Sequence, residues 1–556
     1  MPMKLISIGV SFLLGILDFS AQETKTLWQK DIESSTQEIL SGLTTTLDGQ
    51  YLLSGSSINT KPQKLSTDNS QANNGYDYHI LKLDQKGGKV WEKYFSGNKN
   101  DYLNTSVSTQ EGGFLLAGSS YSSQSGDKKE ISFGSSDMWI IKVDENGEEE
   151  WQRTIGTKYS EDAYSAVQTT DLGYVIAGGI SGAKFGYGSK DAIITKLDKE
   201  GKILYQLILG GNNNDQVEKI IPTKDGGCLI GIYSQSSTGT LEEKESIPSK
   251  EFLNTYSIPS KNSDNTSEDY EVSFYQKQTP NYGIGDYWLV KLDKNGKVQW
   301  EKNYGGEEDD HIRTLAFTDN GYIVGGESRS KPSGNKEAGI KEGTDLWLIS
   351  LDENGEQQWQ TSYDFSTRDI LMSLNTIKDK DDKNKGYLIG GYSQAEGKTK
   401  KDDETFWMMY VNAEGKEQWR KLVEGKDKRK EERLVSALMN RDGSYVLAGT
   451  SAEQLGEQNW KIVKLGSKQL EDLIEKQDIR IYPNPVEDYC YVEIGLEIEK
   501  GQQFEVYVHD MSGKMVQTIK TTNQVTKINT SSLPQGVYIV TATTPTKSVN
   551  AKIVKK

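Results

Sequence analysis

The chain has 556 residues, with 65 Lys and Arg against 81 Asp and Glu, which gives a formal net charge of −16. This acidic balance, with lysines scattered among more numerous acids, argues against nucleic acid as a partner. Aromatic residues make up 9% and Gly contributes 55 positions, which excludes a disordered chain and favours strands and turns over helices. Two distant cysteines, Cys228 and Cys490, exclude a disulfide framework, and we expect both to be small core residues.

Residues 1–21 predict a secretory signal peptide. Lys4 precedes an apolar run, 5–17, and the small residues Ser20 and Ala21 end the segment. The alternative is a short N-terminal membrane anchor, but the run is shorter than the ~20 residues that a bilayer span needs. No later segment is long and apolar enough to cross a bilayer, so we expect no transmembrane span after signal removal.

A repeat organises residues 22–466. A glycine phrase such as GYVIAGG occurs seven times, and a phrase such as DYWLVKLD follows each copy after a polar loop of variable length. A third phrase carries an aromatic residue, and six copies follow in order: Trp91, Trp151, Tyr205, Trp300, Trp359 and Trp419. The seventh copy is found at the N-terminus, around Trp28.

With a further apolar segment before each glycine phrase, every unit holds four short alternating segments typical of strands. Seven four-stranded units, the last completed by the N-terminal strand, predict an all-β fold with a seven-bladed β-propeller. A closed ring needs the borrowed strand because it removes an open sheet edge. A hairpin array or several small sandwiches are the alternatives. Repeated Trp is expected to be core between blades and not a sugar-stacking platform.

The connections differ between the two faces of such a ring. Tight turns such as 144–147 and 223–226 fall on one face, whereas the long loops after the glycine phrases fall on the other. The longest loop, 234–285 in the fourth unit, reads as a tolerated polar surface insertion. Since loops on a rigid scaffold carry function more often than tight turns, we expect the long-loop face to be functional.

An acidic residue begins each innermost strand, and together these residues form a candidate anionic rim around the channel. Such a rim would bind a cation such as calcium, a cationic group or sugar hydroxyls, because a bound cation relieves repulsion between carboxylates. The alternative is that each acid fixes a turn by accepting backbone hydrogen bonds. In the third and fifth units the acidic neighbour, Glu161 or Asp309, could be the equivalent residue. The candidate residues are Glu38, Asp101, Asp162, Asp215, Asp310, Asp369 and Glu432.

Catalytic motifs are scarce. The three histidines lie in different repeats or modules, so a Ser/His/Asp triad or a His-rich metal site is hard to build, and no catalytic or metal residues are assigned. His79 stands where other units have Trp, which predicts a packing role. The Asp-x-x-Gly-x-x-x-Trp turns at 144–151, 293–300 and 352–359 resemble the tryptophan-docking repeats of quinoprotein-type propellers. That resemblance supports the fold and not redox chemistry.

After residue 466 the repeat stops. Residues 467–478 are a charged, helix-compatible linker, and 479–556 alternate strands and turns in a way that suggests a small Ig-like β-sandwich. The phrases IYPNP, VHDMSGKMV and LPQGVYIV within it closely resemble the type A C-terminal sorting domain of Bacteroidetes proteins exported by the type IX secretion system. The matching residues are Tyr482, Pro483, Asn484, Pro485, Asp510, Gly513, Lys514, Leu533, Pro534, Gly536 and Tyr538.

The resemblance implies an export route. It makes the type IX machinery and its sortase the expected partners, with passage through the periplasm and release or attachment at the outer-membrane surface after the sorting domain is cut off. A generic Ig-like appendage is the alternative. For the ring, we expect a glycan- or protein-binding adhesion module that uses the long-loop face. The alternatives are a carboxylate-dependent glycoside hydrolase or lyase, and a structural surface protein without a small ligand.

Overall fold

A computed structural model describes residues 24–556 except 33–37, 59–74, 183–185, 238–270, 342, 366–367, 380, 395–404, 424–430, 453–458, 475–476, 496–501 and 546. The expected signal peptide, residues 1–21, lies outside the described residues. Within them, no helix has the length and apolar character needed to span a membrane.

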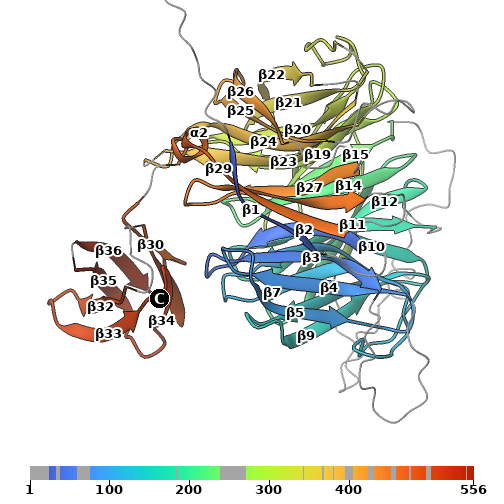
Figure 1. Ribbon diagram of the computed structural model, residues 1–556. Helices are drawn as coiled ribbons and strands as arrows, with labels where there is room; N and C mark the ends of the chain where they lie inside the picture. The colour runs from blue at the N-terminus through green and yellow to red at the C-terminus, as the bar shows by residue number, and fades with distance from the viewer. Residues whose placement is uncertain are drawn as a thin grey trace, which may run out of the picture.

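Short strands joined by turns make up most of the described chain, which confirms the all-β class (Figure 1). In the described residues of the repeat region, the strands form seven sheets, numbered here in chain order. The first sheet holds β2 (Glu38–Thr45), β3 (Tyr51–Ile58), β4 (Tyr76–Leu83) and β5 (Lys89–Phe95). The second holds β6 (Asp101–Ser108), β7 (Phe114–Ser120), β8 (Asp137–Val143) and β9 (Glu149–Ile155). The third holds β10 (Ser160–Gln168), β11 (Tyr174–Ser181), β12 (Lys190–Leu197), β13 (Ile203–Gly210) and β16 (Glu271–Gln276).

The remaining sheets repeat this pattern. The fourth holds β14 (Asp215–Pro222), β15 (Cys228–Ser234), β17 (Asp286–Leu292) and β18 (Val298–Tyr304). The fifth holds β19 (Asp310–Phe317), β20 (Gly321–Ser328), β21 (Asp345–Asp352) and β22 (Gln357–Tyr363). The sixth holds β23 (Arg368–Lys378), β24 (Asn384–Gln394), β25 (Thr405–Asn412) and β26 (Glu417–Val423). The seventh holds β27 (Glu431–Met439), β28 (Tyr445–Ala452), β29 (Asn459–Gly466) and the N-terminal β1 (Lys25–Ile32).

The seventh sheet joins the two ends of the repeat region, as predicted. Strand β1 pairs antiparallel with β29, and Trp28 stands opposite Lys464 (Figure 1). The first strand of each sheet also contacts the first strand of the next, and β27 of the seventh sheet contacts β2 of the first. The sheets therefore follow one another in a cycle, called the ring below. This is the order that the predicted propeller requires.

Tryptophans of the outermost strands connect neighbouring sheets. Five of these indoles donate from Nε1 to a backbone carbonyl in the turn between the third and fourth strands of the next sheet, at 2.9–3.3 Å. A Cβ on the turn residue Gly87 would lie 3.2 Å from the Trp28 ring, so the glycine admits the indole against the backbone. The donor and acceptor pairs are Trp28 with Gln85, Trp91 with Glu145, Trp151 with Lys199, Trp300 with Glu353, and Trp359 with Ala413.

A second set of aromatic residues fills the space between sheets. The indoles of the third strands are fully buried: Trp139, Trp288, Trp347, Trp407 and Trp460. His79 takes the corresponding place in the first sheet, where it stacks on Trp460 at 4.5 Å and on Tyr94 at 4.3 Å. These positions agree with the predicted core role of the repeated aromatics and with His79 as a packing substitute.

The end of the long insertion is structured, unlike the polar surface loop expected for 234–285. Strand β16 adds to the third sheet in parallel with β13, pairing Leu207 with Ser273. It thereby covers the outer edge of a neighbouring sheet, which would otherwise expose unpaired backbone groups. Phe274 also packs against the core between the second and third sheets. The insertion thus ties the third and fourth sheets together, and its residues 238–270 lie outside the described residues.

The expected linker begins as part of the ring. Helix α2 (Lys468–Glu471) is capped by Ser467, whose Oγ accepts from the Leu470 N–H at 3.2 Å. Leu470 and Leu473 are buried in a core cluster against which Trp419 packs. The seventh sheet has no hairpin turn at this point because its outermost strand comes from the N-terminus. The two leucines thus belong to the core cluster that Trp419 packs against, and this cluster continues beyond the expected boundary at 466.

The C-terminal module is a two-sheet sandwich with its own core. Val506, Val540 and Ile553 are among its fully buried side chains. One sheet holds β30 (Ile479–Tyr482), β31 (Tyr489–Ile494) and β34 (Val525–Asn529). The other holds β33 (Met515–Thr521), β32 (Phe504–Asp510), β35 (Gly536–Thr543) and β36 (Ser548–Lys555).

Replacing Trp28 tests how much the N-terminal strand contributes to the ring. We expect Trp28→Ala to lower the free energy of unfolding by ~3 kcal/mol, since it removes a large packed side chain and its hydrogen bond to the first sheet. Urea unfolding followed by circular dichroism measures this. The matched control is Leu27→Ala on the same strand, where an exposed side chain should cost less than about 1 kcal/mol. Equal losses in the two variants would show that the Trp28 contact does not stabilise the ring.

Candidate functional site

The candidate rim acids are buried. Glu38 is 2% exposed, and Asp101, Asp215, Asp310 and Asp369 are each 0% exposed. Asp162 is half-buried, and the side chain of Glu432 lies outside the described part of the structure. The rim residues are therefore not spread over an accessible surface, although they begin the first strands as predicted.

Each buried acid holds the link that leads into its strand. In every case described here, a carboxylate oxygen accepts the backbone N–H of the residue four positions earlier, at 2.6–2.9 Å. Serines from the loop after the second strand complete the site, as when Ser122 Oγ donates to Asp101 at 2.9 Å. These contacts are those of the turn-fixing alternative. The pairs are Gly97 with Asp101, Thr157 with Glu161, Gly211 with Asp215, Gly306 with Asp310, and Phe365 with Asp369.

In the third sheet this position belongs to Glu161 and not to Asp162. Glu161 is 1% exposed, and its carboxylate accepts from the Thr157 N–H at 2.9 Å. Burial raises the pKa of Glu161 to about 7, and the hydrogen bonds from Thr157 only partly offset this. Asp162, one residue later, accepts hydrogen bonds from Ser136 Oγ and Tyr164 Oη instead, each at 3.3 Å.

Three buried lysines accompany the acids in the second, fourth and fifth sheets. Lys128, Lys277 and Lys336 each lie nine positions before the Asp that begins the third strand. Lys336 Nζ donates to the Ser330 carbonyl at 2.8 Å, and the charges of Asp310 and Asp345 act on it. Burial lowers the pKa of Lys277 and of Lys336 to about 8. The sequence contains this constant Lys-to-Asp spacing, but the spacing alone does not indicate that the lysines are buried.

Partly exposed polar side chains and the buried Glu327 form a continuous network just beyond the buried acids. We call this set the mouth array, because its members stand at the long-loop ends of the strands in the third to fifth sheets. Its members are Asp162, Tyr164, Lys190, Gln216, Glu218, His311, Arg313 and Glu327. Sequence reasoning missed most of them, because they vary from unit to unit and do not follow the repeat.

Hydrogen bonds run through the third and fourth sheets of the array. Lys190 Nζ donates to Tyr164 Oη at 2.8 Å and to Gln216 Oε1 at 3.3 Å. Gln216 Nε2 in turn donates to Glu218 Oε1 at 2.8 Å. Tyr164 Oη donates to Asp162 at 3.3 Å, and burial followed by the nearby Asp162 charge raises the pKa of this phenol. Every charged group in this half is thus matched by a partner.

The fifth sheet continues the network. His311 Nε2 lies 3.0 Å from Glu218 Oε1, and Arg313 bridges Glu218 at 3.7 Å and Glu327 at 2.8 Å. The His311 ring stacks on Tyr233, with centroids 4.0 Å apart. His311 was predicted to begin an inner strand, and it does so as the second residue of β19. It is therefore fixed in place between a carboxylate and an aromatic ring.

Tyrosines extend the mouth array toward the first and second sheets. Tyr102 lies 5.3 Å from Tyr76 and 6.3 Å from Tyr121 between ring centroids. Tyr121 is 41% exposed, and its proximity contributes to the raised pKa of Tyr164, after burial and Asp162. Aromatic faces beside paired polar groups are the surface that a hydroxyl-rich ligand uses, with stacking on the rings and hydrogen bonds to the polar groups.

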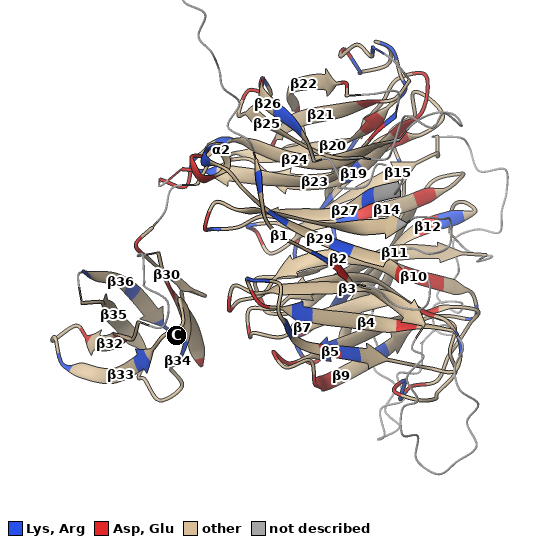
Figure 2. Cartoon of the chain, viewed as in Figure 1, with Lys and Arg blue, Asp and Glu red and all other residues tan. Residues whose placement is uncertain are grey.

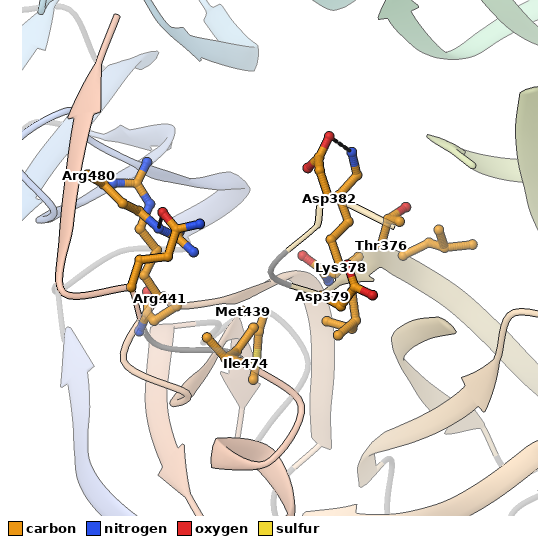
Figure 3. Close-up of a pocket in the computed structure, with 13 residues that line it drawn as sticks. Thr376, Lys378, Asp379, Asp382, Met439, Arg441, Ile474 and Arg480 are labelled. Atoms are coloured by element: carbon orange, nitrogen blue, oxygen red, sulfur yellow. Dashed lines mark hydrogen bonds and ion pairs between the residues drawn. The ribbon is translucent and has the colours of Figure 1, made fainter. Parts of the chain in front are cut away.

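The turn face carries two open grooves. One of about 550 Å³ lies beside the sixth and seventh sheets. Figure 3 shows Arg441 and Arg480 on one of its walls and the Lys378–Asp382 ion pair on the other. The second, of about 430 Å³, lies between turns of the fourth and fifth sheets. Acidic and basic residues are interspersed over both modules in Figure 2, in keeping with the mixed charge of these grooves. Among the described residues, no cluster of His, Cys, Asp and Glu is suited to hold a metal ion.

The residues of the sorting phrases hold the C-terminal sandwich together. Asn484 fastens its loop to β36 by donating to the Lys552 carbonyl at 2.9 Å and accepting from the Val554 N–H at 3.0 Å. Asp510 closes the turn that contains Gly513 and Lys514, accepting from the Lys514 N–H at 3.0 Å. Tyr538 Oη donates to the Pro534 carbonyl at 2.7 Å. Most of the motif therefore has a structural explanation within the module.

Comparison with known families identifies this module. Residues 480–556 match the family model described as a secretion system C-terminal sorting domain. This agrees with the expectation of a type IX sorting domain, and it places the protein outside the cell or on the outer-membrane surface. No curated protein matches the sequence.

Several solved structures are similar to the chain at low identity. A polysaccharide lyase is 9% identical with a TM-score of 0.39, covering 78% of this chain and 90% of that one. An apocarotenoid oxygenase mutant of Synechocystis is 8% identical with a TM-score of 0.36, covering 90% and 97%. A lignostilbene dioxygenase of Pseudomonas brassicacearum is 9% identical with a TM-score of 0.36, covering 78% and 93%. These values are too low to bear on the function of this chain.

The raised pKa of Glu161 predicts a pH-dependent stability. The folded-state pKa of about 7 exceeds the ordinary value of 4.5, so the folded chain holds the extra proton between these values. This contribution to stability is present below the lower value and is lost as the pH rises through the higher one. Between pH 4.5 and 7.5 we expect the wild type to lose ~3 kcal/mol more than Glu161→Gln does. Urea unfolding at both pH values measures it, and parallel pH profiles would contradict the assignment.

Removing a buried lysine should destabilise the long-loop face. We expect Lys336→Met to lower the free energy of unfolding by ~3 kcal/mol, because it leaves Asp310 and two carbonyls without their cation. Lys331→Met, at an exposed position of the same loop, is the matched control and should change stability by less than about 0.5 kcal/mol. A Lys336→Met variant as stable as the control would show that the buried cation is dispensable.

Proposed function

We propose that the protein is a surface-exposed or secreted β-propeller whose long-loop face binds an extracellular glycan. The seven sheets are its blades, a reading supported by the cyclic contacts from β2 through β27 and by the N-terminal strand in the last sheet. The sorting domain supplies the location, and the ring supplies the binding surface.

The mouth array is the observation that carries the proposal. It combines tyrosine rings with donors and acceptors on one face of a rigid scaffold, and each of its charged groups already has a hydrogen-bond or ion-pair partner in the protein. Charged groups that are already held by protein partners favour a neutral, hydroxyl-rich ligand over an ion. The rim acids then serve the site indirectly, by holding the loops that surround it.

Enzymatic cleavage of a polysaccharide is the second candidate. It is favoured by His311, which is held by Glu218 and stacked on Tyr233 beside the guanidinium of Arg313. An imidazole fixed by a carboxylate and a stacked ring can move a proton, and an adjacent guanidinium can stabilise developing negative charge. The appearance of new reducing ends on incubation with polysaccharides would favour this function over binding alone.

A glycan array with the exported chain tests the proposal. We expect selective binding of neutral oligosaccharides, weakened ~10-fold in Tyr121→Ala because a stacking ring is lost. The matched control is Tyr282→Ala, which removes a tyrosine of similar exposure, 43% against 41%, outside the mouth array. Equal binding by the two variants would contradict a site at the mouth array. Binding of a protein and of no glycan would contradict the glycan assignment.

A further inference from the structure

The sorting domain contacts the ring on the turn face, opposite the mouth array. Tyr482, the first residue of its sorting motif, donates from Oη to the Leu47 carbonyl at 2.9 Å. Leu47 belongs to a tight turn of the first sheet, and a Cβ on the following turn glycine, Gly49, would lie 3.3 Å from Val525 of the sorting domain. The sheet formed by β30, β31 and β34 is therefore the side of the module that faces the ring (Figure 1).

Glu145 is the main polar contact of the second sheet with the sorting domain. Its carboxylate accepts from Tyr491 Oη at 3.2 Å and pairs with Lys527 Nζ at 2.9 Å. Lys527 also lies over the ring of Tyr489, 4.2 Å from its centroid. The Glu145 carbonyl meanwhile accepts the Trp91 indole N–H, so the same turn joins two sheets of the ring and receives the sorting domain.

Arg441 makes the contact from the seventh sheet. Its guanidinium lies 4.1 Å from the centroid of the Tyr482 ring and forms an ion pair with Glu493 of β31. Burial at this contact raises the pKa of the Tyr482 phenol to about 12. The groove of Figure 3, with Arg480 on the wall of Arg441, borders this contact.

We propose that the turn face is a docking site for the chain's own sorting domain, which keeps the Tyr482 side of that domain covered until the dock opens. Three separate sheets of the ring contribute to it, through Leu47, Glu145 and Arg441. The contacts are polar and partly exposed, and such ion pairs are weak and screened by salt. Because the two modules are joined by a short connection, weak contacts suffice to hold them together, yet the dock stays reversible.

Hydroxyl-radical footprinting of Tyr482 and Tyr491 in the full chain tests the dock. We expect Glu145→Lys to raise the oxidation of both tyrosines roughly two- to fivefold, since it removes a surface ion pair and places two cations together. The exchanged double variant, Glu145→Lys with Lys527→Glu, should return oxidation toward the wild-type rate. Raising the salt concentration should increase the oxidation of both tyrosines in the wild type. It should not change their oxidation in a variant whose sorting domain is already undocked.

The chain provides a matched control for local damage to a turn. Glu353 has the same place in an identical Asp-Glu-Asn-Gly turn, and its carbonyl also accepts a tryptophan N–H, from Trp300 at 3.2 Å, but it lies beside the other groove. Glu353→Lys should leave Tyr482 and Tyr491 at their wild-type oxidation. Equal oxidation of these tyrosines in wild type and Glu145→Lys would overturn the proposal. Protection that disappears on dilution would also overturn it, by showing a contact between two chains.

Discussion

The contact between an outer-strand tryptophan and the turn of the next sheet determines how the ring is assembled. The indole donates one hydrogen bond to a turn carbonyl and covers a glycine that has no side chain to obstruct it. Trp28 makes this contact from the N-terminal strand, so the first sheet is held by the last in the same way as four other pairs of neighbouring sheets are held. Where the turn is missing, Trp419 packs against a core cluster that includes Leu470 of α2 and Leu473 just beyond the helix.

This construction separates the two faces of the ring. Turns that receive a tryptophan must keep their geometry, and they offer little beyond their outward side chains, such as Glu145, for other contacts. The long loops do not receive these tryptophans. Their backbone is held by hydrogen bonds to buried acids, serines and lysines. The mouth array is thus supported by hydrogen-bonded loops, while its own residues vary from sheet to sheet. In this account the sorting domain occupies one face and a ligand the other.

Much of the fold could be predicted from the sequence, because it depends on patterns that repeat. The glycine phrases, the aromatic positions and the displaced Trp28 strand each have a local physical cause. The role of the acids was harder to predict. An acidic residue at the start of a strand gives the same sequence pattern whether its side chain is buried, like Asp101, or partly exposed, like Asp162. Arg313 and Glu327 were missed because their pairing brings together different strands at positions without a repeat. The contact of Tyr482 with Leu47 joins residues far apart in the chain, which no local pattern reveals.

A crystal structure of the full chain, sorting domain included, with a bound neutral oligosaccharide is the most direct test of the separate roles of the two faces. We expect the sugar to lie on the long-loop face, with a ring stacked on Tyr102 or Tyr121 and hydroxyls bonded to Lys190 or Gln216. A sugar seated in a groove of the turn face, or between the ring and the sorting domain, would contradict the assignment of separate roles to the two faces.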